Sequence, residues 1–92
     1  MNVTVEFATQ IRRAAGTASS VVEVADGASV GDVLRTVAAQ HGDTVGRLLL
    51  DDDGHVRPSV LAFAGDRQIR DASSTAVADG DVLTIMTPIS GG

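Results

Sequence analysis

The 92-residue sequence contains no cysteine, no lysine, no tryptophan and no tyrosine. Without cysteine, the chain has no disulfide bonds, thiolate nucleophiles or thiolate metal ligands. All seven basic residues are arginines, so the chain offers no ε-amine at which a carboxylate could form an isopeptide bond. Because aromatic residues make up only 2% of the sequence, we expect a core of Val, Leu, Ile and Ala.

The sequence also lacks an excess of positive charge and any long apolar run. Its formal net charge is −5, and the arginines do not cluster beyond Arg12 and Arg13. Such a chain has no general affinity for nucleic-acid backbones or anionic membranes. The longest apolar run, residues 60–64, is too short to span a bilayer, and the first residues do not resemble a signal peptide. We therefore expect a cytoplasmic protein with neither a nucleic-acid nor a membrane partner.

What is present predicts one folded domain, since 43% of the residues are apolar and 21% are charged. Residues 2–8 alternate between apolar and polar, which predicts a half-buried strand. After a loop over residues 9–19, residues 21–24 are predicted to return antiparallel to it. Further strands are expected over residues 59–64, 67–69 and 82–87, and Pro58 is expected to mark a strand start or a sheet edge.

A helix is predicted to begin after Ser29, because Ser29 and Asp32 have the spacing of a capping box. Apolar residues then recur at helical spacing as far as His41. Gly42 is expected to follow the helix in the left-handed conformation. A further short helical turn is expected over residues 44–50.

The predicted order is β-β-α-β-β-β, with the first and last strands as a parallel central pair joined through the helix. This is an α+β fold of the β-grasp, or ubiquitin-like, type: a mixed sheet of four to five strands with one main crossing helix. We expect the β-grasp domain to span residues 1–87 and residues 88–92 to form a flexible C-terminal diglycine tail.

Catalytic and nucleotide-binding motifs are absent, so we do not expect an enzyme. His41 and His55 are predicted to be structural or solvated. The acidic turn at residues 51–54 does not match an EF-hand, because its glycine comes two positions early and Ala62 stands where the last ligand should be. We therefore expect no metal site and no cofactor bound by the chain.

The sequence closes on Gly91 and Gly92, directly after the last predicted strand. Without Cβ atoms, a diglycine can enter a narrow channel and adopt backbone angles closed to other residues. The carboxylate of Gly92 has a pKa near 3.3–3.7 in model compounds and is an anion at neutral pH. It can attack the α-phosphate of ATP in a partner's active site, and a sulfur nucleophile can then displace AMP.

The whole chain resembles the ThiS/MoaD family of ubiquitin-like sulfur carrier proteins. The resemblance is carried by residues 29–34 at the helix start, by Ala-Asp-Gly-Asp at residues 78–81, and by the closing Pro-Ile-Ser-Gly-Gly. It implies that an E1-like enzyme uses ATP to adenylate Gly92 and converts it to a thiocarboxylate. A sulfur-accepting synthase in cofactor, cysteine or metabolite biosynthesis would then take the sulfur. In length the chain is similar to the cysteine-biosynthesis carrier and to the small subunit of molybdopterin synthase.

In this interpretation Gly91, Ser90 and Ile89 thread into the partner, while Phe63 and Met86 offer apolar contacts beside the tail. Two alternatives remain open. The chain could instead be a ubiquitin-like modifier conjugated to lysines of other proteins, since the same activated carboxylate serves that role. It could also be a β-grasp interaction module with an inert tail.

Overall fold

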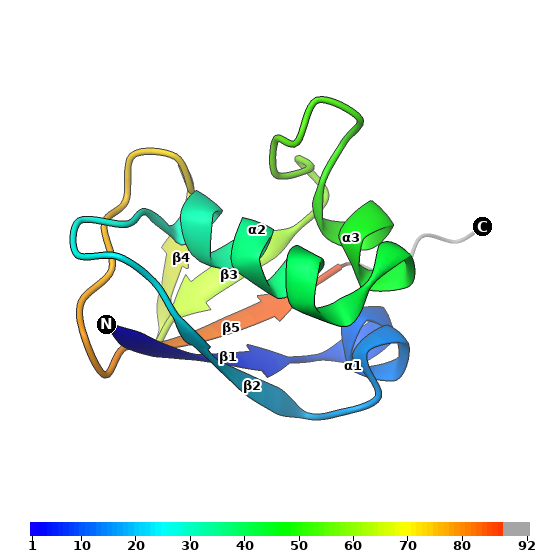
Figure 1. Ribbon diagram of the computed structural model, residues 1–92, viewed down its shortest axis with the longest axis horizontal. Helices are drawn as coiled ribbons and strands as arrows, with labels where there is room; N and C mark the ends of the chain where they lie inside the picture. The colour runs from blue at the N-terminus through cyan, green and yellow to red at the C-terminus, as the bar shows by residue number, and fades with distance from the viewer. Residues whose placement is uncertain (88–92) are drawn as a thin grey trace.

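Five strands form one mixed sheet, and the longest helix, α2, covers one of its faces (Figure 1). A computed structural model describes residues 1–87. The strands are β1 (Asn2–Phe7), β2 (Ser19–Glu23), β3 (Leu61–Ala64), β4 (Arg67–Ile69) and β5 (Val82–Met86). The helices are α1 (Thr9–Ala15), α2 (Val30–His41) and α3 (Asp43–Leu49).

The strand order across the sheet is β2-β1-β5-β3-β4. β1 and β5 pair in parallel at its centre, with Thr4 opposite Val82 and Val5 opposite Leu83, and the other neighbours pair antiparallel. The predicted β-grasp arrangement, with the first and last strands as the central pair, is therefore confirmed. As a result, the end of β5 leaves from the middle of the sheet.

The capping box that opens α2 is confirmed. The backbone N–H of Asp32 donates to the Ser29 hydroxyl at 3.1 Å, and the N–H of Ser29 donates to the Asp32 carboxylate at 3.0 Å. Gly42 has the expected positive φ of 84°, but its ψ of −173° lies outside the left-handed helical region. This glycine thus turns the chain from α2 directly into α3, which confirms the predicted helical turn there.

The loop predicted over residues 9–19 is wrong in part, because residues 9–15 form α1. Its one fully buried side chain is Ile11, which packs into the core. The helix ends at Gly16 in the left-handed conformation, and the N–H of Gly16 donates to the carbonyl of Arg12. A seven-residue helix is too short to be stable by itself. Burial of Ile11 supplies the stabilisation that the local sequence pattern does not reveal.

The start predicted for the third strand is also wrong. Residues 57–60 form a turn in which the N–H of Val60 donates to the carbonyl of Arg57 at 3.0 Å. Pro58 and Ser59 lie within this turn, so β3 begins at Leu61. Pro58 is therefore part of a turn rather than the first residue of a strand.

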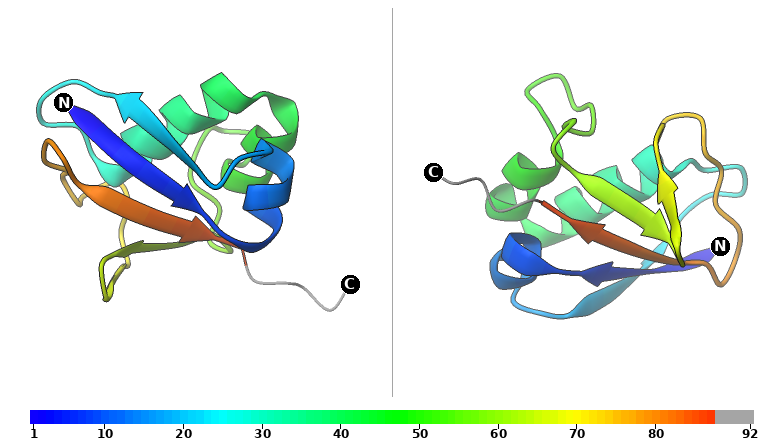
Figure 2. Two further views of the ribbon diagram at one scale, coloured as in Figure 1. Left: turned by 90° about the horizontal axis from the view of Figure 1, so that it is seen from below. Right: turned by 180° about the vertical axis from the view of Figure 1, so that it is seen from behind.

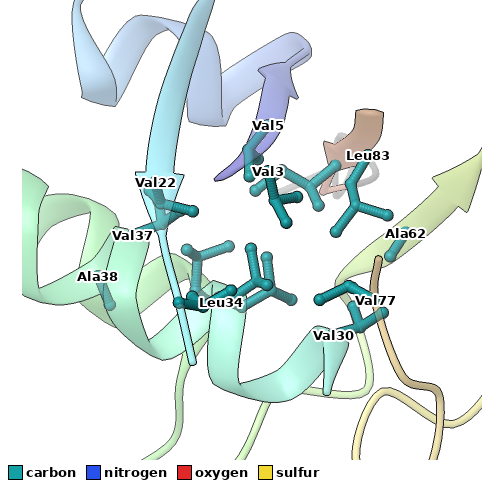
Figure 3. Close-up of a cluster of buried hydrophobic side chains, with 14 of the residues drawn as sticks. Val3, Val5, Val22, Val30, Leu34, Val37, Ala38, Ala62, Val77 and Leu83 are labelled. Atoms are coloured by element: carbon teal, nitrogen blue, oxygen red, sulfur yellow. The ribbon is translucent and has the colours of Figure 1, made fainter. Parts of the chain in front are cut away.

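The core lies between the sheet and the helices and is almost entirely aliphatic, as predicted (Figure 3). Val5 and Leu83 from the central strands pack in it with Leu34 and Val37 from α2. Phe7 is its one aromatic member. Each large apolar side chain buried here contributes about 1.5–3 kcal/mol of stability. Within residues 1–87, no helix is long and apolar enough to cross a membrane.

Candidate functional site

The site predicted from the sequence starts where β5 ends. Gly92, Gly91, Ser90 and Ile89, like the rest of the predicted tail over residues 88–92, lie outside the described residues. The structure instead describes the base from which these residues continue. That base consists of Thr87, which contacts the first turn of α1 through Thr9 and Gln10, and of the end of β5, beside which α1 lies (Figure 2).

Thr87 is buried, with 5% of its surface exposed, and α1 lies beside it. The hydroxyl of Thr9 donates to the Thr87 carbonyl at 3.0 Å. The hydroxyl of Thr87 in turn donates to the side-chain oxygen of Gln10 at 3.4 Å. One residue before α1, the N–H of Ala8 donates to the carbonyl of Ile85. The chain is thus held at three points as it leaves the sheet.

Thr9 holds this position at a conformational cost. Its φ is 56°, a region that β-branched residues rarely adopt. Backbone strain of this kind costs on the order of 1–3 kcal/mol and persists where surrounding contacts impose it. Here the contacts are the hydrogen bonds of the Thr9 hydroxyl to the carbonyls of Ala8 and Thr87. Such strain is concentrated at functional sites.

Phe63 and Met86 lie on the same face of the sheet, the one turned away from α2. Across β3 and β5, Phe63 pairs with Thr84 and Leu61 pairs with Met86. Because paired residues share a face, Phe63 and Met86 are diagonal neighbours on it. Both side chains are half-buried, so each keeps part of its apolar surface accessible beside the end of β5.

Leu61, which was not among the predicted contact residues, completes this apolar cluster opposite Met86. We call Leu61, Phe63 and Met86 the outer apolar cluster. The two-residue spacing from Leu61 to Phe63 is the signal that could have revealed it. Toward β2 the same face carries Val82 and Val21, which are 46% and 64% exposed.

The two histidines differ in their surroundings. The His41 ring meets the Phe7 ring edge-on, with centroids 5.4 Å apart, and its Nε2 is buried without a hydrogen-bond partner among residues 1–87. His55 is exposed in the acidic turn. There, one potential metal-ligating atom from each of His55, Asp51 and Asp53 lies within 4.8 Å of the other two. Backbone N–H groups of His55 and Asp53 donate to Asp51 and lower the pKa of its carboxyl. This carboxylate therefore stabilises the turn itself.

The sequence profile of the ThiS family matches residues 5–92, nearly the full length of the chain. The chain therefore belongs to the ThiS family. The matched range runs through the closing diglycine, so the predicted site falls within the shared region.

Two relatives of this ThiS-family chain match it from end to end. Small archaeal modifier protein 3 of Haloferax volcanii is 35% identical over 94 residues, and 100% of each chain is covered. Sulfur carrier protein CysO of Mycobacterium tuberculosis is 33% identical over 95 residues, with the same full coverage. By their names these relatives are a small modifier and a sulfur carrier.

Solved structures agree with the family and the fold. The crystal structure of SAMP1 from Haloferax volcanii superposes with a TM-score of 0.87 at 25% identity, covering 100% of both chains. The crystal structure of the BexX/CysO complex of Amycolatopsis orientalis matches with a TM-score of 0.68 at 29% identity. That match covers 98% of this chain and 99% of the other.

Proposed function

We propose that this ThiS-family protein is a sulfur carrier whose working group is the carboxylate of Gly92. The observation that carries the proposal is the family match, which continues to the closing Gly91-Gly92. The end-to-end likeness to a protein named as a sulfur carrier adds support.

The chemistry needs two steps. A carboxylate oxygen of Gly92 attacks the α-phosphorus of ATP, pyrophosphate leaves, and an acyl-adenylate forms. A sulfide-equivalent nucleophile then attacks the acyl carbon, AMP leaves, and the proton of the nucleophile passes to solvent. The product is a thiocarboxylate. The chain offers a carboxylate, and the partner supplies ATP, the sulfur source and the catalytic groups.

In this proposal residues 1–87 form the folded domain and residues 88–92 form a tail that carries the reacting carboxylate. Five extended residues span at most about 18 Å, which is enough to enter a narrow active site. Ile89, Ser90 and Gly91 would occupy the channel. The hydrogen bonds that hold Thr87 support this division, because they fix the start of the tail against the domain.

The proposed partners are an E1-like adenylating enzyme and a sulfur-accepting synthase. The outer apolar cluster adjoins the end of β5 and suits contact with an apolar patch of either partner. The net charge of −5 favours steering toward a partner of positive potential. The CysO chain that matches this one is crystallised in complex with BexX.

The test is to incubate the protein with ATP, sulfide and an E1-like enzyme from the same genome, and to measure the intact mass. The expected product is heavier by one oxygen-to-sulfur exchange. A variant that lacks Gly92 should remain folded and unmodified. If none of the E1-like enzymes of that genome changes the mass of the full-length protein, the proposal is wrong.

A second function, conjugation to lysines of other proteins, is favoured by the relative named Small archaeal modifier protein 3. It uses the same acyl-adenylate but ends in an isopeptide bond. Because the chain has no lysine, each acceptor lysine would carry a single unit rather than a lysine-linked chain of them. Gly-Gly remnants on lysines of digested lysate proteins, dependent on Gly92, would distinguish this function from sulfur transfer alone.

A further inference from the structure

A cavity of about 290 Å³ opens between the start of α2, strands β3 and β4, and the loops that flank these strands. These elements lie at the β4 side of the sheet (Figure 1), and the lining residue Val60 precedes Leu61, which pairs with Met86 near the end of β5. The cavity is the size of about ten water molecules in the liquid, or roughly ten non-hydrogen atoms.

The floor of the cavity is apolar. Leu34 of α2 and Ala62 of β3 are buried beneath it, and the half-buried side chains of Val56, Val60 and Ile69 line its walls. Sites for small ligands combine such a floor with a few placed polar groups. An apolar ligand body of a few carbons could displace water from this surface.

The rim of the cavity is basic, although the whole chain is acidic. Three of the seven arginines line it: Arg35 from α2, Arg57 from the loop before β3, and Arg70 from the end of β4. These three residues come from separate segments of the chain and line the same cavity. Arg12 and Arg13 also line a hollow beside α1, but they are neighbours in one helix rather than residues from separate segments.

The donors on two of these arginines are available. Arg57 uses its Nε to donate to the carbonyl of Arg47 at 2.7 Å, which fixes the side chain and leaves its two terminal nitrogens without a partner among residues 1–87. Arg70 forms no hydrogen bond or ion pair within the same part of the chain. Arg35 is already paired with Asp32 at 2.7 Å.

The acidic groups near the rim are held within their own turns. Asp51 accepts hydrogen bonds from the N–H groups of His55 and Asp53, which lower the pKa of its carboxyl together with the charge of Arg57. Asp71 accepts hydrogen bonds from the hydroxyl and the N–H of Ser73, which lower the pKa of its carboxyl and hold the carboxylate within its own turn. The N–H groups at the start of α2 do not contribute either, because Val30 and Gly31 donate to the carbonyls of Thr75 and Ala72. The arginine side chains are therefore the positively charged hydrogen-bond donors that the cavity offers.

We propose that this cavity binds a small organic anion. A carboxylate or phosphate head would accept hydrogen bonds from Arg57 and Arg70, whose planar guanidinium groups match the geometry of such anions. An apolar body would lie on Leu34 and Ala62.

The experiment titrates isotope-labelled full-length protein with four probes and follows backbone amide shifts by NMR. The probes are benzoate, phenyl phosphate, inorganic phosphate and the neutral benzyl alcohol. Saturable shifts confined to residues around Leu34, Val56 and Ile69 are expected with benzoate or phenyl phosphate, and the stronger of the two identifies the preferred head group. Inorganic phosphate and benzyl alcohol should bind at least tenfold more weakly.

Two variants make the test specific. Arg70→Gln should weaken binding of the preferred anion about tenfold, the typical loss for one charge-assisted hydrogen bond. The matched control, Arg13→Gln, removes the same charge from α1 and should leave binding unchanged. Equal weakening by both variants would mean that anion affinity depends only on the net charge of the protein. If benzyl alcohol binds as tightly as the preferred anion, the guanidinium groups contribute nothing to binding. Either result, or no saturable shift with any anion, overturns the proposal.

Discussion

The hydroxyl of Thr9 donates to the backbone carbonyl of Thr87 at 3.0 Å, across a separation of 78 residues in the sequence. This bond joins the first residue of α1 to the residue that follows β5. It is made by a residue whose own φ of 56° is strained. The contact therefore restricts the direction in which the chain leaves the sheet, at the point where the proposed tail begins.

Replacement of Thr9 should show whether its hydrogen bond to Thr87 positions the tail for the activating enzyme, apart from what the bond contributes to stability. Thr9→Val keeps the shape of the side chain but removes the donor, so we expect a severalfold lower kcat/KM for thiocarboxylate formation by the E1-like enzyme. Loss of the hydrogen bond should also reduce the free energy of unfolding by about 1 kcal/mol. The measurements are steady-state kinetics and urea denaturation.

Thr9→Ser is the matched control, because it retains the hydroxyl. Its kcat/KM should stay close to that of the unchanged protein. If the serine and valine variants lose the same activity, the hydrogen bond to Thr87 has no role in positioning.

The outer apolar cluster should affect affinity for the activating enzyme more than the chemical step. Phe63→Ala removes an accessible aromatic surface, and we expect KM to rise about tenfold or more while kcat changes little. Val21→Ala, on the same face but at the β2 edge, is the control and should leave KM unchanged. A fall in kcat alone for Phe63→Ala would contradict a docking role.

The central strand pair should dominate stability. Leu83 is almost completely buried opposite Val5, and Leu83→Ala should lower the free energy of unfolding by about 2–5 kcal/mol. Val21→Ala, with 64% of the residue exposed, should change it by less than about 0.5 kcal/mol. Chemical denaturation monitored by circular dichroism measures both values.

The cap of α2 should make stability depend on pH. The N–H of Ser29, and after it the guanidinium of Arg35, lower the pKa of the Asp32 carboxyl from its usual 3.8. A carboxyl whose pKa is lower in the folded state stabilises the protein above the unfolded pKa. That contribution is lost as the pH falls from about 3.8 through the lowered folded value.

Asp32→Asn should therefore flatten the change in unfolding free energy across this acidic range, while Asp52→Asn, at a carboxyl outside the cap, should not. Unfolding curves at a series of pH values test the comparison. Identical pH profiles for Asp32→Asn and the unchanged protein would show that the Asp32 carboxylate does not contribute to the pH dependence of stability.

Most of the sheet could be predicted because alternation marks strands whose two faces differ. Val3 and Val5 face the core and Thr4 faces outward, as the pattern in the sequence requires. The capping box of α2 could be predicted for a similar reason, since Ser29 and Asp32 interact within one turn. Features set by neighbouring residues are visible in a sequence.

Features set by distant residues were not visible. α1 depends on burial of Ile11 against elements formed much later in the chain, so its local pattern resembles a polar loop. The bond from Thr9 to Thr87 and the convergence of Arg57 with Arg70 depend on the folded geometry in the same way. The predicted roles of Gly91 and Gly92 stay predictions, since they concern residues beyond Thr87.

The position of β5 has a consequence for synthesis of the protein. This strand is the last of the five to be made, yet it lies between β1 and β3 and joins the two antiparallel pairs into one sheet. While residues 1–81 emerge from the ribosome, β1–β2 and β3–β4 are two separate hairpins with no strand between them, and such hairpins are at best marginally stable. Folding must therefore await release of Met86, so a prematurely terminated chain would be an unfolded target for proteolysis rather than a defective carrier competing for partners.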